Sequence, residues 1–159
     1  MLWVIKMPIE IERKFLVNSN VFKENAQKHE LKQVYLSATD KMAIRVRIDG
    51  IQATLAIKSK ESERINREYE YMIPMDEAIS LVKLQDFPTI IKTRHVLEHE
   101  GHIWEVDEFH GKNSGLIVAE IELNNENEEF KIPSWIEKEV TSDYRYLNSN
   151  LALNPFSQW

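Results

Sequence analysis

Short segments in which apolar and charged residues alternate constrain the fold of this chain more than any other feature. Residues 9–16, 43–48 and 102–109 show the pattern most clearly. Because successive side chains of a strand point to opposite faces, the alternation indicates strands with one apolar and one polar face. Further strands are predicted at 34–37, 51–60, 67–73, 90–97 and 116–123. We therefore expect a mainly antiparallel sheet of about eight strands, which often closes into a barrel and so removes its edges.

Helical signals are fewer and lie between or after the predicted strands. Asn18 or Ser19 would cap a first helix that runs to about His29. Asp76 would cap a second helix that runs to about Gln85. Residues 133–152 suit a C-terminal helical segment. No linker divides the 159 residues, a length that suits one domain. The prediction is a single domain, mainly β with helices packed outside (α+β), over 1–159. Residues 1–7 would be a short extension, and Met7 is a plausible second start.

Composition excludes several classes of protein. The chain contains no cysteine, which rules out a disulfide scaffold and any zinc or thiol site built on cysteine. No apolar run approaches the roughly 20 residues of a membrane span, and the first seven residues are too short for a secretory signal. A net charge of −6 argues against binding to nucleic acid or to an anionic membrane. We expect a cytoplasmic protein, with a homodimer left open.

The charges of the predicted strands come in pairs of one sign, two residues apart on one face. The acidic pairs are Glu10 and Glu12, Glu68 and Glu70, and Glu120 and Glu122, while Asp107 shares a face with Glu105. The basic pairs are Arg45 and Arg47, Lys58 and Lys60, and Lys92 and Arg94. Any one pair is most simply a solvated face, but such faces usually mix signs because like charges repel.

The recurrence of these pairs on six strands instead suits a site for metal ions and a phosphate chain. Paired carboxylates supply hard oxygen ligands for Mg²⁺ or Mn²⁺. Paired arginines and lysines supply donors for phosphate oxygens. A barrel interior would bring the strands together around one ligand.

The motifs also resemble, in order, those of a known superfamily. Glu10-Ile11-Glu12-Arg13-Lys14 matches the ExExK signature of the CYTH superfamily, and the likeness continues through Arg45-Val46-Arg47, Arg67-Glu68-Tyr69-Glu70, Lys92-Thr93-Arg94, Glu105-Val106-Asp107, Glu120-Ile121-Glu122 and Asp143-Tyr144-Arg145-Tyr146. That superfamily includes class IV adenylyl cyclases, thiamine triphosphatases and the small bacterial inorganic triphosphatases called triphosphate tunnel metalloenzymes. The opening IEIERKFLV is most similar to the small bacterial members. The resemblance implies an eight-stranded antiparallel tunnel that holds a triphosphate along its axis.

The resemblance, combined with side-chain chemistry, implies roles for the charged residues. The expected ligands of a principal Mg²⁺ or Mn²⁺ ion are Glu10, Glu12, Glu120 and Glu122. A second ion, or the attacking water, would be held by Glu68, Glu70 and Asp107. The phosphate oxygens would be bound by Lys14, Arg45, Arg47, Lys58, Lys92, Arg94 and Arg145.

Proton transfer is assigned to Lys58 and Tyr35. Cationic neighbours would lower the pKa of Lys58, because like charges disfavour its charged form. The small bacterial members pair this lysine with a tyrosine, and Tyr35 matches that position. An ordinary strand aromatic is an equally good interpretation of Tyr35.

The favoured function is metal-dependent hydrolysis of inorganic triphosphate, a small polyanionic substrate, by in-line attack of water. The alternatives are a class IV adenylyl cyclase, a thiamine triphosphatase and a non-catalytic binder of polyphosphate or nucleotide. A mere anion binder gains nothing from seven acids beside its ligand, and the compact length and the opening segment favour the hydrolase. The tunnel motifs hold seven basic and seven acidic residues, so the net charge of −6 belongs to the outer surface and does not exclude a polyanion inside.

Overall fold

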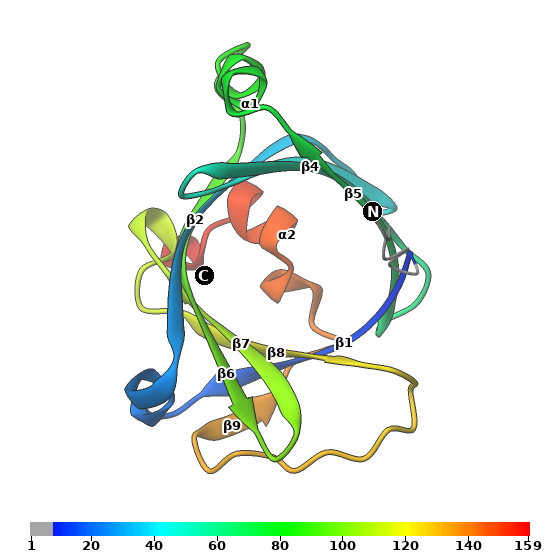
Figure 1. Cartoon of the computed structure of the whole chain (residues 1–159), viewed down its shortest axis with the longest axis vertical. Helices are drawn as coiled ribbons and strands as arrows, with labels where there is room; N and C mark the ends of the chain where they lie inside the picture. The colour runs from blue at the N-terminus through cyan, green and yellow to red at the C-terminus, as the bar shows by residue number, and fades with distance from the viewer. Residues whose placement is uncertain (1–7) are drawn as a thin grey trace, which may run out of the picture.

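Eight antiparallel strands close into a barrel in the computed structural model, which describes residues 8–159 (Figure 1). The strands are β1 (Ile9–Val17), β2 (Gln27–Ala38), β3 (Met42–Asp49), β4 (Gln52–Lys60), β5 (Ile65–Ile73), β6 (Thr89–His99), β7 (His102–Phe109), β8 (Ile117–Leu123) and an additional β9 (Ile136–Glu139). They follow the order β5-β4-β3-β2-β6-β7-β8-β1, and β1 pairs with β5 to complete the ring. The predicted eight-stranded antiparallel barrel is confirmed, while the expected extension at 1–7 and the choice of start lie outside the described residues.

The seam of the barrel runs along β1. One edge of this strand pairs with β8 over Ile11–Leu16. The other edge is divided, because Ile9–Ile11 pairs with β5 whereas Phe15 and Val17 pair with β9. The amino-terminal half of β1 therefore lies between β5 and β8, the two strands that carry the other acidic pairs.

The polar faces of the strands point into the barrel and the apolar faces point outward. Lys14 lies opposite Glu120 across β1 and β8, and Lys58 lies opposite Glu68 across β4 and β5. A sheet usually turns its apolar face to the interior and its polar face to solvent, and in this barrel the two faces are exchanged, with the charged side chains inside. Helices and loops must then cover the outer apolar face.

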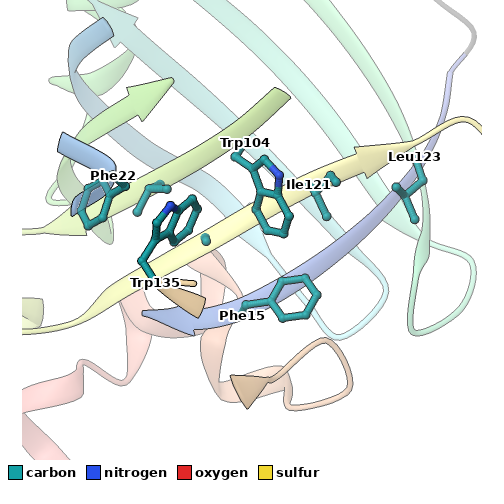
Figure 2. Close-up of a cluster of buried hydrophobic side chains, with 8 residues drawn as sticks. Phe15, Phe22, Trp104, Ile121, Leu123 and Trp135 are labelled. Atoms are coloured by element: carbon teal, nitrogen blue, oxygen red, sulfur yellow. The ribbon is translucent and has the colours of Figure 1, made fainter. Parts of the chain in front are cut away.

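Two apolar clusters cover the outside. Figure 2 shows the larger one, where Phe15 of β1, Trp104 of β7 and Ile121 of β8 pack with Phe22 and with Trp135 from the loop before β9. Trp104 is fully buried, and burying a side chain of this size stabilises a fold by about 3 kcal/mol. Helix α1 (Met75–Val82) covers the second cluster, on β3 and β4. These clusters fix the outer wall behind the charged interior.

A third apolar cluster fills one end of the barrel. The short helix α2 (Asn148–Leu153) lies within the ring of strands in Figure 1, and its Leu151 is fully buried. Leu151 packs with Tyr35, Ile90 and Phe109 from the inner faces of β2, β6 and β7. The charged part of the tunnel is therefore bounded by apolar packing at this end.

The helix predicted at 18–29 is wrong. Only a 3-10 turn, η1 (Val21–Asn25), forms there, and β2 begins at Gln27, well before the predicted strand at 34–37. Residues 27–34 pair with β6, so tertiary pairing overrides the local helical signal. Phe22 anchors the turn by packing edge-on to His95 and at a tilt against Trp135.

The helical segment predicted at 133–152 is only partly correct. It begins with strand β9, which pairs with β1, and only then come the 3-10 turn η3 (Tyr144–Tyr146) and α2. The remaining 3-10 turns are η2 (Gly111–Asn113) and η4 (Phe156–Gln158). The helix predicted at 76–85 is present as α1. Within 8–159 no helix has both the length and the apolar character to cross a membrane.

Candidate active site

A cavity of about 210 Å³ occupies the barrel interior and is lined almost entirely by charge. The acidic side chains that line it are Glu10, Glu12, Glu68, Glu70, Glu105, Glu120 and Glu122. The basic ones are Lys14, Arg45, Arg47, Lys58 and Arg94. Ile103, Ile121 and Asn148 complete the lining. With seven acids and five bases, the lining carries a formal charge of −2 when all are ionised.

Two lysines bind the acidic residues of the seam. Lys14 Nζ lies 2.5 Å from Glu120 Oε1 and 3.3 Å from Glu12 Oε1. Lys58 Nζ lies 3.2 Å from Glu10 Oε2 and 3.5 Å from Glu12 Oε2. Lys14 therefore joins β1 to β8, and Lys58, whose Nζ also lies 3.5 Å from Glu68 Oε2, joins β1 to β5.

Arginines bind the carboxylates of the other walls. Arg45 Nη2 lies 3.0 Å from Glu68 Oε1 and 3.6 Å from Glu70 Oε2. Arg94 pairs with Glu105, and its Nη2 lies 3.4 Å from Glu120 Oε2. The charged interior is therefore a continuous network of ion pairs.

The expected lowering of the Lys58 pKa is wrong. Burial is the largest single effect and lowers this pKa, but Glu12, Glu68 and Glu10 together outweigh burial and Lys14. The pKa of Lys58 is therefore raised. Its ammonium holds its proton firmly, which suits the binding of phosphate oxygens.

Tyr35 lies behind the charged cavity. It is buried in the apolar cluster at the end that α2 fills, and its hydroxyl lies 3.5 Å from the side-chain amide of Gln33. It sits opposite Arg45 on the neighbouring strand. Burial raises the pKa of Tyr35, although Arg45 and Lys58 act in the other direction.

Lys92 and Asp107 lie behind the cavity wall, with exposures of 0% and 1%. Lys92 Nζ donates to Asp107 Oδ2 at 2.5 Å and to Asn148 Oδ1 at 3.1 Å. Asp107 also accepts two bonds from Arg94, at 2.7 and 2.8 Å. Burial lowers the pKa of Lys92 to about 8. In this arrangement Asp107 orients two cations, one of which lines the cavity.

Arg145 lies outside the tunnel cavity. It is exposed, and Asp143 holds it through a contact of 2.6 Å between Arg145 Nη2 and Asp143 Oδ2. It lines a second cavity together with Lys60, the other member of the Lys58 pair.

Three residues that line the cavity or contact its lining were not predicted from the sequence as site residues. Glu105 shares the inner face of β7 with Asp107, and the alternation already contained that signal. Asn66 donates to Glu12 Oε1 at 3.2 Å, and its position opposite Glu10 becomes evident only from the closure of β1 on β5. Asn148 reaches the tunnel because α2 enters the barrel, and no local pattern indicates that contact.

The donor chemistry of the β1 and β8 acids fits a hard divalent cation. Glu12 lies opposite Glu122, and Glu10 and Glu120 line the same cavity. Carboxylate oxygens are the ligands that Mg²⁺ and Mn²⁺ prefer. Within 8–159, however, no three acidic or histidine side chains converge as a metal site, and Lys14 lies between Glu12 and Glu120. Binding of an ion here requires that the carboxylates exchange their lysine partners for it.

The buried carboxylates make the fold sensitive to acid. Burial alone would raise the pKa of Glu120, but Lys14 and Arg94 lower it well below its ordinary value of 4.5. The same balance lowers the pKa of Glu12 and Asp107. As pH falls below about 4.5, the unfolded chain takes up protons that the native carboxylates do not, so stability falls. Urea unfolding between pH 7 and pH 3 should show this decline, and it should be shallower in Glu120→Gln.

Comparison with known proteins places this architecture in a family. The model of the CYTH domain matches residues 8–152. The chain belongs to the CYTH family. It is 43% identical to an inorganic triphosphatase of Acetivibrio thermocellus over 151 residues, which cover 94% of this chain and 97% of that protein. It is 34% identical to an inorganic triphosphatase of Nitrosomonas europaea, with 91% of this chain and 97% of that protein covered.

Two solved structures agree with the barrel. The crystal structure of the inorganic triphosphatase NE1496 is similar with a TM-score of 0.68 at 34% identity, covering 91% of this chain and 94% of that chain. A putative adenylate cyclase of Bacillus halodurans has a TM-score of 0.61 at 19% identity, covering 76% and 84% of the two chains, which indicates a shared fold alone. CYTH triphosphatases in general depend on a metal ion.

Proposed function

We propose that this protein is a metal-dependent hydrolase of inorganic triphosphate that works inside the barrel. The observation that carries the proposal is the charged cavity, in which five cations and seven carboxylates surround one space of about 210 Å³. The 43% identity to an inorganic triphosphatase along almost the whole chain supports the same assignment.

The charge of the lining argues for a metal requirement. A cavity at −2 repels a polyanion, and one divalent ion would bring it to zero. We assign the principal Mg²⁺ or Mn²⁺ ion to Glu10, Glu12, Glu120 and Glu122. Glu68 and Glu70 are the candidates for a second ion. A bound ion supplies charge neutralisation and Lewis acidity at the phosphate oxygens.

The cations released from those carboxylates would bind the triphosphate. In the structure, carboxylates of β1, β7 and β8 pair with Lys14, Lys58 and Arg94. The basic surface continues along β3 through Arg45 and Arg47. Phosphoryl transfer depends mainly on positioning and on neutralising the oxygens. Lys58 would hold its proton at Nζ and donate to the phosphate chain while water attacks in line.

The fully buried residues have supporting roles in this proposal. Asp107 would position Arg94, and Lys92 would add positive potential from behind the wall. Tyr35 faces Arg45 from the next strand, so a catalytic effect of Tyr35 would be exerted through Arg45 and Lys58 and not by direct contact with substrate.

The cavity favours inorganic triphosphate over ATP or thiamine triphosphate. Its only apolar lining within the described chain comes from Ile103 and Ile121. Sites for drug-sized organic ligands usually measure about 300–1,000 Å³ and are mostly apolar. A base or thiazolium ring would gain little from this lining, whereas a bare phosphate chain could use all of it.

A phosphate-release assay tests the proposed function. Tripolyphosphate, ATP and thiamine triphosphate are each supplied with Mg²⁺, with Mn²⁺ and with a chelator. We expect release from tripolyphosphate with a divalent ion, at least about tenfold less from either organic triphosphate, and none with the chelator. Absence of release from all three would contradict the hydrolase, and cyclic AMP formed from ATP would favour the cyclase.

A further inference from the structure

A second cavity, of about 570 Å³, lies at the end of the barrel that α2 fills. The turn between β2 and β3, the end of β4 and the C-terminal segment surround it. Its charged and large apolar lining residues include Asp40, Lys60, Tyr144, Arg145, Leu153 and Trp159. None of them lines the tunnel cavity.

Large apolar side chains are exposed at this cavity. Tyr144 is 67% exposed, Leu153 57% and Trp159 42%. An exposed apolar patch with a polar rim typically marks a binding site. The cavity volume also falls in the usual range of about 300–1,000 Å³ for small organic ligands.

Two cations meet this apolar wall. The Lys60 ammonium has no ion-pair partner among residues 8–159. The guanidinium of Arg145 is held by Asp143, with Nη2 to Oδ2 at 2.6 Å and Nε to Oδ1 at 3.0 Å, and it lies 5.0 Å from the ring centroid of Trp159. Asp40 is the one acid in the lining. Asp143, outside the lining, neutralises Arg145, so Lys60 is the cation of this cavity that has no acidic partner within 8–159.

We propose that this cavity binds an organic phosphate with a flat ring, of the nucleoside monophosphate class. The phosphate would lie between Lys60 and Arg145, and the ring would lie on the wall formed by Tyr144, Leu153 and Trp159. Inorganic phosphate alone leaves the apolar wall uncovered, and an uncharged ring leaves Lys60 without an anion. A ligand that carries both groups would contact the apolar wall and Lys60 at once.

Calorimetry without divalent ions tests this site separately from the tunnel. The probes are adenosine monophosphate, adenosine and orthophosphate, each titrated into the full chain with chelator present. We expect adenosine monophosphate to bind at submillimolar concentration and each fragment at least about tenfold more weakly. No binding up to about 1 mM, or equal binding of orthophosphate, overturns the proposal.

Variants locate the binding. Lys60→Gln should weaken adenosine monophosphate about tenfold, because it removes a charge-assisted contact. Lys41→Gln, which removes a neighbouring exposed charge outside both cavities, should leave the affinity unchanged. Leu153→Asp, on the apolar wall, should abolish binding while circular dichroism stays native. An affinity unchanged in both Lys60→Gln and Leu153→Asp overturns the proposal. The tripolyphosphate assay is independent of every one of these outcomes.

Discussion

Glu122→Gln is expected to lower kcat/KM for tripolyphosphate by at least about 100-fold while the fold stays intact. Glu122 lines the tunnel from β8 and lies opposite Glu12 of β1. The substitution keeps the shape of the side chain and removes one negative charge from the set assigned to the principal metal. Because Glu122 is exposed toward the cavity, its loss should cost little stability. Steady-state phosphate release measures the effect, and circular dichroism checks the fold.

Glu137→Gln is the matched control. Glu137 lies on β9, is exposed and does not line the tunnel, so the same chemical change should leave turnover within about twofold of wild type. Wild-type turnover in Glu122→Gln would show that Glu122 is not a metal ligand. Equal losses in both variants would point to a general effect of surface charge.

Asp107→Ala is expected to destabilise the protein by about 3–5 kcal/mol. Asp107 is fully buried and bonds Lys92 and Arg94, so its removal leaves the buried Lys92 without a carboxylate and leaves Arg94 with Glu105 and Glu120 alone. Loss of one partner from a buried pair is costly because the remaining charge stays desolvated. The free energy of unfolding in urea at pH 7 gives the cost.

Asp143→Ala provides the comparison for this prediction. Asp143 and Arg145 form an exposed ion pair, which contributes at most about 1 kcal/mol. A similar small cost for Asp107→Ala would contradict its role as the anchor of Arg94. Normal stability with weakened metal binding would instead restore Asp107 to the metal set predicted from sequence.

The sequence predicted the barrel because its alternation is so regular. The same-sign pairs on β1, β3, β5 and β8 were placed on one face by spacing alone, and the structure directs those faces into one cavity. The spacing of residues along a strand predicts which face a side chain is on, but not how deeply it is buried. Lys92 and Asp107 share the inward faces of their strands, yet neither lines the cavity, because Lys92 contacts Asn148 of α2 and Asp107 is held by Lys92 and Arg94.

Long-range closure explains the other differences. The helical signal at 18–29 is overridden when residues 27–34 pair with β6. When the ring closes, β5 pairs with only the first part of β1, so the edge of β1 at Phe15 and Val17 has no partner in the ring. Strand β9 forms by pairing with that edge. The pKa of Lys58 was predicted from basic neighbours, whereas it is raised by Glu12, which the seam brings close, and by Glu68, which lies opposite Lys58 on β5.

The central claim is that the tunnel binds triphosphate together with a divalent ion. It is tested most directly by calorimetry with a methylene-bridged, nonhydrolysable analogue of tripolyphosphate, in the presence and in the absence of Mg²⁺ or Mn²⁺. We predict that the ion tightens binding at least about 100-fold, because it cancels the net negative charge of the lining and so removes the repulsion between the lining and the polyanion. Equal affinity with and without the ion would contradict the claim.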